Sequence, residues 1–172
     1  MPTVFILHGL GGSSEENWFP WAARELRKKG YEVIVPNFPH SDDPTYRAWA
    51  THLDTFGSKI KSDTIFIGHS LGVPFGMRYL AERGKRIAHF ICTAPPFTDL
   101  DWEALRDMMS GFPLENAGNV AEKFTLFASD DDPHIPLDHI RKYEELLGIT
   151  ATILPGREHL WQREMPEVLK CL

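Results

Sequence analysis

Residues Thr64–Gly72 read Thr-Ile-Phe-Ile-Gly-His-Ser-Leu-Gly, and this stretch decides the fold. Its first half is a short apolar run typical of a buried strand, and a helix is predicted directly after it, over Leu71–Arg83. The turn between them fits the pattern G-x-S-x-G, whose two glycines let strand and helix approach each other. Such a turn holds Ser70 above the sheet at a helix N-terminus, where the helix dipole favours developing negative charge. The alternative is an ordinary N-capping serine in a glycine-rich turn.

Strand-like and helix-like segments alternate along the whole chain, which predicts a parallel sheet with helices on both faces. No internal repeat or linker interrupts this pattern, so we expect residues 1–172 to form one α/β domain. Its architecture would be a three-layer α/β/α sandwich around a mainly parallel, six-stranded sheet. The predicted strands are Thr3–Leu7, Glu32–Val35, Thr64–Gly68, Ile87–Thr93, Phe124–Ser129 and Thr150–Leu154. The predicted helices are Trp18–Lys29, Thr45–Lys59, Leu71–Arg83, Trp102–Met109, Leu137–Leu147 and Met165–Leu172.

Composition excludes several classes of function. The 18 Lys and Arg residues against 24 Asp and Glu residues give a net charge of -6, which argues against a nucleic acid or an anionic membrane as partner. No apolar run reaches the roughly 18 residues of a membrane helix, and the first strand starts too early for a signal peptide. Two distant cysteines, Cys92 and Cys171, form neither a disulfide framework nor a zinc motif. A cytoplasmic location is therefore expected.

Ligands of such sheets bind beyond the carboxyl ends of the strands, so the residues after each strand are the candidates for chemistry. A nucleophilic serine needs a base, and the base needs an orienting acid. His159 follows the last predicted strand and is the preferred base, with His134 as the rival. Asp132 is the preferred acid because Pro133 fixes the backbone after it. The adjacent aspartates at 130 and 131 could instead cap the turn, and Asp99 or Asp101 is a further alternative.

The loop after the first strand, His8–Gly12, is predicted to complete the site. Two backbone N–H groups usually hold the oxyanion of a tetrahedral intermediate, and Leu10 and Leu71 are the natural donors here. We expect His8 to brace this loop. A dinucleotide fingerprint is rejected because Ser14 stands where a third glycine or alanine is required. A phosphate-binding P-loop is rejected because no lysine follows.

The chain resembles the small α/β-hydrolases of the retinoblastoma-binding-protein serine hydrolase family and their bacterial YdeN-like relatives. The resemblance extends from the first strand to His159. Within it, Asp131–Pro136 matches a D-D-x-x-x-P pattern that implies Asp132 as the catalytic acid. The family often has glycine before the catalytic histidine, whereas this chain has Glu158. The segments that carry the resemblance are His8–Gly9, Asn17–Trp21, Asn37–Pro39, Gly68–Gly72, Ser129–Pro136 and His159.

These features predict a carboxylesterase-like serine hydrolase with a Ser70–His159–Asp132 triad and a minimal fold without a large lid. No metal or organic cofactor is required. An open, shallow site would take small acyl substrates; Phe38, Phe97, His134 and Trp161 are candidate pocket residues, with core or rim packing as the alternative. Acyl transfer would use the same residues. A protein-binding module is the alternative from another class, and its contacts would come from exposed members of the set Trp18, Trp21, Trp49, Trp102 and Trp161.

Overall fold

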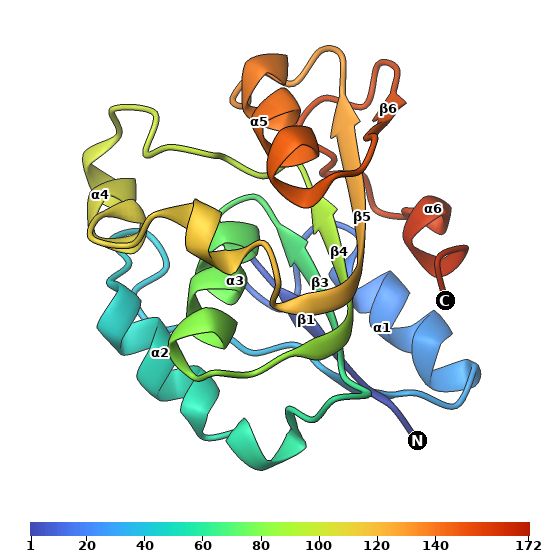
Figure 1. Cartoon of the computed structure of the whole chain (residues 1–172). Helices are drawn as coiled ribbons and strands as arrows, with labels where there is room; N and C mark the ends of the chain where they lie inside the picture. The colour runs from blue at the N-terminus through green and yellow to red at the C-terminus, as the bar shows by residue number, and fades with distance from the viewer.

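A single sheet of six strands runs through the computed structural model, which describes all 172 residues. All five strand pairings are parallel, and the order across the sheet is β2-β1-β3-β4-β5-β6 (Figure 1). The predicted parallel sheet is thereby confirmed. The strands are β1 (Thr3–Leu7), β2 (Glu32–Ile34), β3 (Ile65–His69), β4 (Ile87–Thr93), β5 (Ala121–Ser129) and β6 (Thr152–Leu154).

Helices cover both faces of the sheet, as the alternating pattern predicts. Helices α1 and α6 lie on one face, whereas α2, α3 and α5 lie on the other (Figure 1). None of the helices is long and apolar enough to span a lipid bilayer. The helices are α1 (Phe19–Lys28), α2 (Tyr46–Asp54), α3 (Gly72–Glu82), α4 (Glu103–Met109), α5 (Leu137–Leu147) and α6 (Pro166–Leu169), and short 3-10 turns occupy Gly57–Lys59 and Leu114–Ala117.

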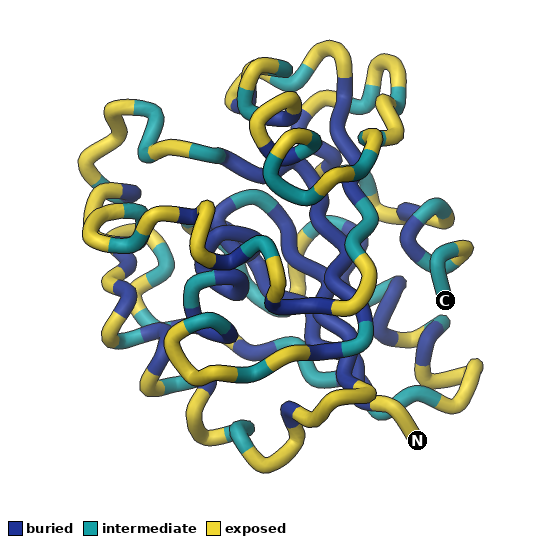
Figure 2. The backbone as a smooth tube through the Cα atoms, viewed as in Figure 1, coloured by how far each residue is buried: buried dark blue, intermediate teal, exposed yellow.

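Strands β1 and β3 are buried along their whole length because each face of the sheet is covered by its own core (Figure 2). In β1, Val4 and Ile6 belong to the core under α1 and α6, while Phe5 and Leu7 belong to the core on the opposite face. Neighbouring side chains of a strand point to opposite faces, so a single strand supplies both cores. Each such residue contributes about 1.5–3 kcal/mol by its burial.

Several predicted boundaries differ from the structure, most clearly in α2, α6, β5 and β6. Helix α6 ends at Leu169, before the predicted end at Leu172. Helix α2 was expected to reach Lys59 but ends at Asp54, and a 3-10 turn begins at Gly57, a poor helix former. Strand β5 starts at Ala121, before the predicted start. Strand β6 starts at Thr152 because the left-handed Gly148 ends α5, and Ala151 N–H donates to the Glu144 carboxylate instead of a neighbouring strand.

The topology creates a crevice at one edge of the sheet. Strands β1 and β3 are neighbours, yet β1 connects to β2 through α1 on one face of the sheet and β3 connects to β4 through α3 on the other face. Such switch points leave room for a ligand beyond the carboxyl ends of the strands. Only α4 and the 3-10 turn Leu114–Ala117 stand between β4 and β5, so the fold has no large lid.

Candidate active site

Ser70 occupies the sharp turn between β3 and α3. Its backbone is left-handed, with φ of 52°, and its N–H donates to the Thr93 carbonyl at 2.9 Å. The Ser70 side chain caps no helix N–H group, so the structure does not support the alternative of a capping serine. A Cβ at position 72 would lie 2.3 Å from the Leu7 carbonyl oxygen, and one at position 9 would lie 2.9 Å from Ser70 Cβ. The strand-turn-helix junction therefore closes only with glycine at these positions.

The loops after the last two strands bring an imidazole and a carboxylate together. His159 Nδ1 lies 2.8 Å from Asp132 Oδ2, and both side chains are almost completely buried. The other oxygen of Asp132 accepts the backbone N–H groups of His134 and Ile135, at 2.8 and 3.0 Å. These bonds fix the carboxylate, and the carboxylate in turn orients the ring of His159.

The two remaining aspartates clamp the loop that carries His159. Asp130 accepts the Gly156 N–H at 2.9 Å, and Asp131 accepts the Glu158 N–H at 2.7 Å. The Ser129 hydroxyl lies 2.7 Å from the Asp131 carboxylate and lowers the pKa of that carboxyl below its usual value. All three aspartates thus act on one loop, and only Asp132 touches the imidazole.

His69 supports the same loop from the other side. Its ring lies 2.8 Å from the His159 carbonyl oxygen, so Nε2–H is the donor. Burial, with nearby His159 as the next cause, lowers the pKa of His69 to about 3 and keeps the ring neutral. Sequence reasoning missed this contact because it depends on where a loop 90 positions later returns. The position of His69 beside Ser70 was the only available signal.

His8 braces the loop after β1, in agreement with the sequence-based expectation. Its Nδ1–H donates to the Gly9 carbonyl at 2.9 Å, and its Nε2 accepts the Phe38 N–H at 3.0 Å. Burial lowers the pKa of His8, consistent with this neutral tautomer. Within the braced loop, the N–H of Leu10 donates to no protein acceptor, and the same holds for the N–H of Leu71 after Ser70. Both groups are available to a ligand.

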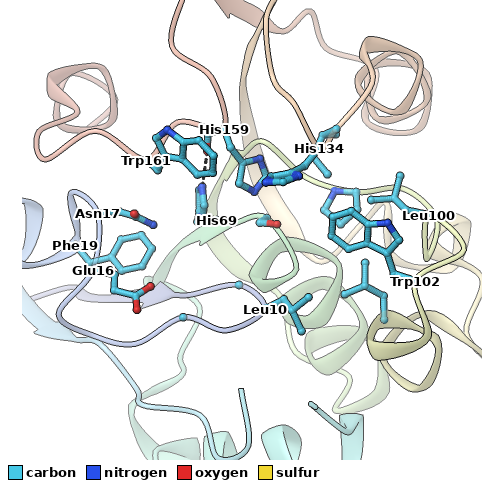
Figure 3. A pocket seen from close by; sticks show the side chains of 16 residues that line it. Leu10, Glu16, Asn17, Phe19, His69, Leu100, Trp102, His134, His159 and Trp161 are labelled. Carbon is cyan, nitrogen blue, oxygen red and sulfur yellow. Dashed lines mark hydrogen bonds between the residues drawn. The ribbon is translucent and has the colours of Figure 1, made fainter. Parts of the chain in front are cut away.

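Ser70 and His159 line one pocket with a volume of about 260 Å³. Figure 3 shows that Glu16, Asn17, Phe19 and Trp161 lie to one side of it, and Leu100 and Trp102 to the other. Of the predicted site residues, those that line this pocket are Leu10, Ser70, His134, His159 and Trp161.

Two predicted pocket residues lie elsewhere. Phe38 is buried in the core, where it stacks on Trp49 with ring centroids 4.5 Å apart. Phe97 packs edge-on against Tyr143 and does not reach the pocket. The prediction was wrong for both: each follows a strand at the correct edge, yet Phe38 is buried in the core and the partly buried Phe97 packs against the outside of that core.

Several pocket residues were missed as site residues by sequence reasoning. Glu16 and Asn17 come from the long connection between β1 and α1, and Leu100 and Trp102 from the turn before α4. For Glu16 and Asn17, the only signal in the sequence was the length of the connection between β1 and α1. Trp102 and Trp161 are 41% and 40% exposed, whereas Trp18 and Trp49 are buried. No group of three or more His, Cys, Asp or Glu side chains is arranged to hold a metal ion.

This topology, with a glycine-flanked serine turn after β3, defines the α/β-hydrolase class. Within that class the chain belongs to the Serine hydrolase family, whose model matches residues 4–165. The Bacillus subtilis (strain 168) protein YdeN is 32% identical over 141 residues, covering 77% of this chain and 72% of YdeN.

Solved structures agree with this assignment. The crystal structure of the ydeN gene product from B. subtilis matches with a TM-score of 0.92, covering 99% of this chain and 96% of that chain at 21% identity. Est1E from Butyrivibrio proteoclasticus matches with a TM-score of 0.77 at 18% identity, covering 99% of this chain and 84% of Est1E. The molecule is therefore a small YdeN-like α/β-hydrolase.

Proposed function

We propose that this serine hydrolase cleaves esters, or related acyl bonds, of small substrates through an acyl-serine intermediate. The observation that carries the proposal is the 2.8 Å contact between His159 and Asp132 at a pocket that Ser70 also lines. Asp132 accepts the Nδ1–H of the imidazole, so Nε2 is free to exchange a proton with the serine or the substrate.

The reaction proceeds in two halves. Ser70 Oγ attacks the acyl carbon while His159 takes its proton, and His159 then gives this proton to the leaving group as the acyl-serine forms. Water, deprotonated by the same imidazole, attacks the acyl-serine, and His159 passes the proton to Ser70 Oγ as the bond to the acyl carbon breaks and the acid is released. Asp132 holds the ring and stabilises its transient positive charge.

The backbone N–H groups of Leu10 and Leu71 are the proposed oxyanion donors. Neither has a partner within the protein, and the turn that holds Leu71 is closed against Gly9 of the Leu10 loop. Donors fixed in this way stabilise the transition state without rearranging, and one of them contributes roughly 3 kcal/mol.

Pocket size supports small acyl substrates. A volume of about 260 Å³ lies below the roughly 300–1,000 Å³ typical of sites for drug-sized ligands. The half-exposed Trp102 and Trp161 line this same pocket, which favours a role in substrate contact over a separate partner-binding surface. We also propose a cytoplasmic location, supported by the free thiols of Cys92 and Cys171.

Activity-based labelling with a fluorophosphonate tests the proposal. We expect the wild-type chain to be labelled and Ser70→Ala to be neither labelled nor active on 4-nitrophenyl acetate. Asp132→Asn should lower kcat roughly 1,000- to 10,000-fold, because the amide no longer holds the required tautomer of His159. The matched control is Asp130→Asn, which keeps an oxygen acceptor for Gly156 N–H and should stay close to wild type.

An inert Ser70 in folded protein would reject the hydrolase mechanism and favour a binding module. A series of 4-nitrophenyl esters should show turnover falling from butyrate to palmitate, and the reverse order would contradict a small substrate. Adding an alcohol acceptor distinguishes acyl transfer, which would yield the new ester in place of the free acid.

A further inference from the structure

The pocket beside Ser70 has an uneven distribution of charge. No lysine or arginine is among its 16 lining residues, and Glu16 is its only carboxylate. Glu16 is exposed, and its side chain makes neither an ion pair nor a hydrogen bond within the protein. In Figure 3 the carboxylate lies beside Phe19 on the wall opposite Trp102.

The backbone of the turn that carries Glu16 is fixed beside the pocket. The Glu16 carbonyl accepts the Phe19 N–H at 3.2 Å, and Asn17 adopts a left-handed backbone with φ of 51°. Phe19 is fully buried under the sheet and also lines the pocket, so it anchors the turn. The Glu16 side chain therefore extends from a fixed backbone, on the same connection between β1 and α1 that carries Leu10.

The other titratable groups that face the pocket are three histidines, His69, His134 and His159. His69 is neutral because burial lowers its pKa to about 3. His159 forms a pair with the carboxylate of Asp132, and His134 packs edge-on against His159 with ring centroids 5.2 Å apart. An anionic substrate would meet Glu16 with no fixed cation beside it.

We propose that Glu16 sets the charge specificity of the pocket, so that the enzyme takes neutral or cationic acyl substrates and discriminates against anionic ones. This inference rests on the proposed function, because it concerns the substrate of the same site. Coulomb attraction or repulsion acts at the pocket wall, where water screens it only in part. Discrimination should therefore be moderate and should decrease with added salt.

Two sets of esters, equal in shape and different in charge, test the proposal. One set places the charge on the alcohol: butyrylcholine, neutral 3,3-dimethylbutyl butyrate and 2-sulfoethyl butyrate. The other places it on the acyl chain: phenyl esters of 4-(trimethylammonio)butyrate, 5,5-dimethylhexanoate and 4-sulfobutyrate. In at least one set we expect kcat/KM to be about five- to tenfold higher for the cationic than for the anionic ester at low salt.

Glu16→Gln should remove this preference when the rates for the cationic and anionic esters are each expressed relative to the neutral ester in the same variant. The control is Glu15→Gln, because Glu15 is also exposed but bonds to Ser14 and does not line the pocket. This variant should keep the full preference. Equal rates for cationic and anionic esters in both sets, or a preference that persists in Glu16→Gln, would overturn the proposal. Failure of the neutral esters and of fluorophosphonate labelling would instead reject the proposed function.

Discussion

Glu158, next to His159, adopts a backbone conformation that glycine adopts at lower cost. Its φ is 48°, in the left-handed region. Members of the family that this chain resembles often have glycine at this position. In this chain the Glu158 carboxylate accepts the Trp161 indole N–H at 2.6 Å and holds that ring at the pocket rim. The chain therefore keeps local strain together with a contact that glycine would not make.

Glu158→Gly should be more stable than Glu158→Ala by about 0.5–1 kcal/mol in free energy of unfolding, because glycine relieves the left-handed strain. Both variants lose the bond to Trp161, so their difference isolates the backbone effect. Urea denaturation of the two variants measures it. An alanine variant as stable as the glycine variant would contradict the strain at this position.

At the scale of elements, the junction between β3 and α3 depends on how closely α3 approaches β1. Gly72 begins α3 against the carbonyls of Leu7 and His8, where a Cβ would lie 2.3 and 2.7 Å from the two oxygens. Backbone atoms of a central strand cannot yield as a flexible side chain would. The strand and the helix would have to separate, and this movement would displace Ser70.

Gly72→Ala should therefore destabilise the protein by about 3 kcal/mol or more, at the upper end of the range for overpacked sites. It should also abolish fluorophosphonate labelling of the fraction that folds. Gly57→Ala is the matched control, because Gly57 has nothing within 4 Å of its Cβ position and no positive φ. Thermal unfolding compares the stability of the two variants. A Gly72→Ala variant as stable as Gly57→Ala would show that α3 does not pack against β1 as closely as the Cβ distances indicate.

Much of the arrangement of strands and helices was predictable from the sequence. Apolar runs and glycine spacing predicted six parallel strands and the serine turn, because these depend on local steric and hydrophobic patterns. The order of residues after the strands, together with Pro133 and the family resemblance, favoured the pair His159 and Asp132, although it left His134 and the neighbouring aspartates as rivals. The fixed orientation of Phe38 and the contact from His69 to the His159 carbonyl could not be predicted, because each depends on how distant loops pack.

At the scale of the whole molecule, four of the eight histidines have a pKa lowered mainly by burial: His8, His69, His89 and His139. For His69 the pKa falls to about 3 and for His89 to about 4. These rings stay neutral in the folded chain but bind protons near pH 6.5 once the chain unfolds. Below that pH the unfolded chain carries more protons than the folded chain.

Stability should therefore be highest above about pH 6.5 and should fall as the pH falls towards about 5, before most carboxylates titrate. Each excess proton contributes a slope of about 1.4 kcal/mol per pH unit. His89→Gln should reduce the slope by up to this amount, since glutamine does not titrate and can still bond to Thr125, which lies 2.9 Å from His89 Nε2. Urea unfolding at about pH 7, 6 and 5 measures both slopes. An unchanged slope in the variant would mean that His89 accepts its proton in the folded protein, contrary to its burial between β3 and β5.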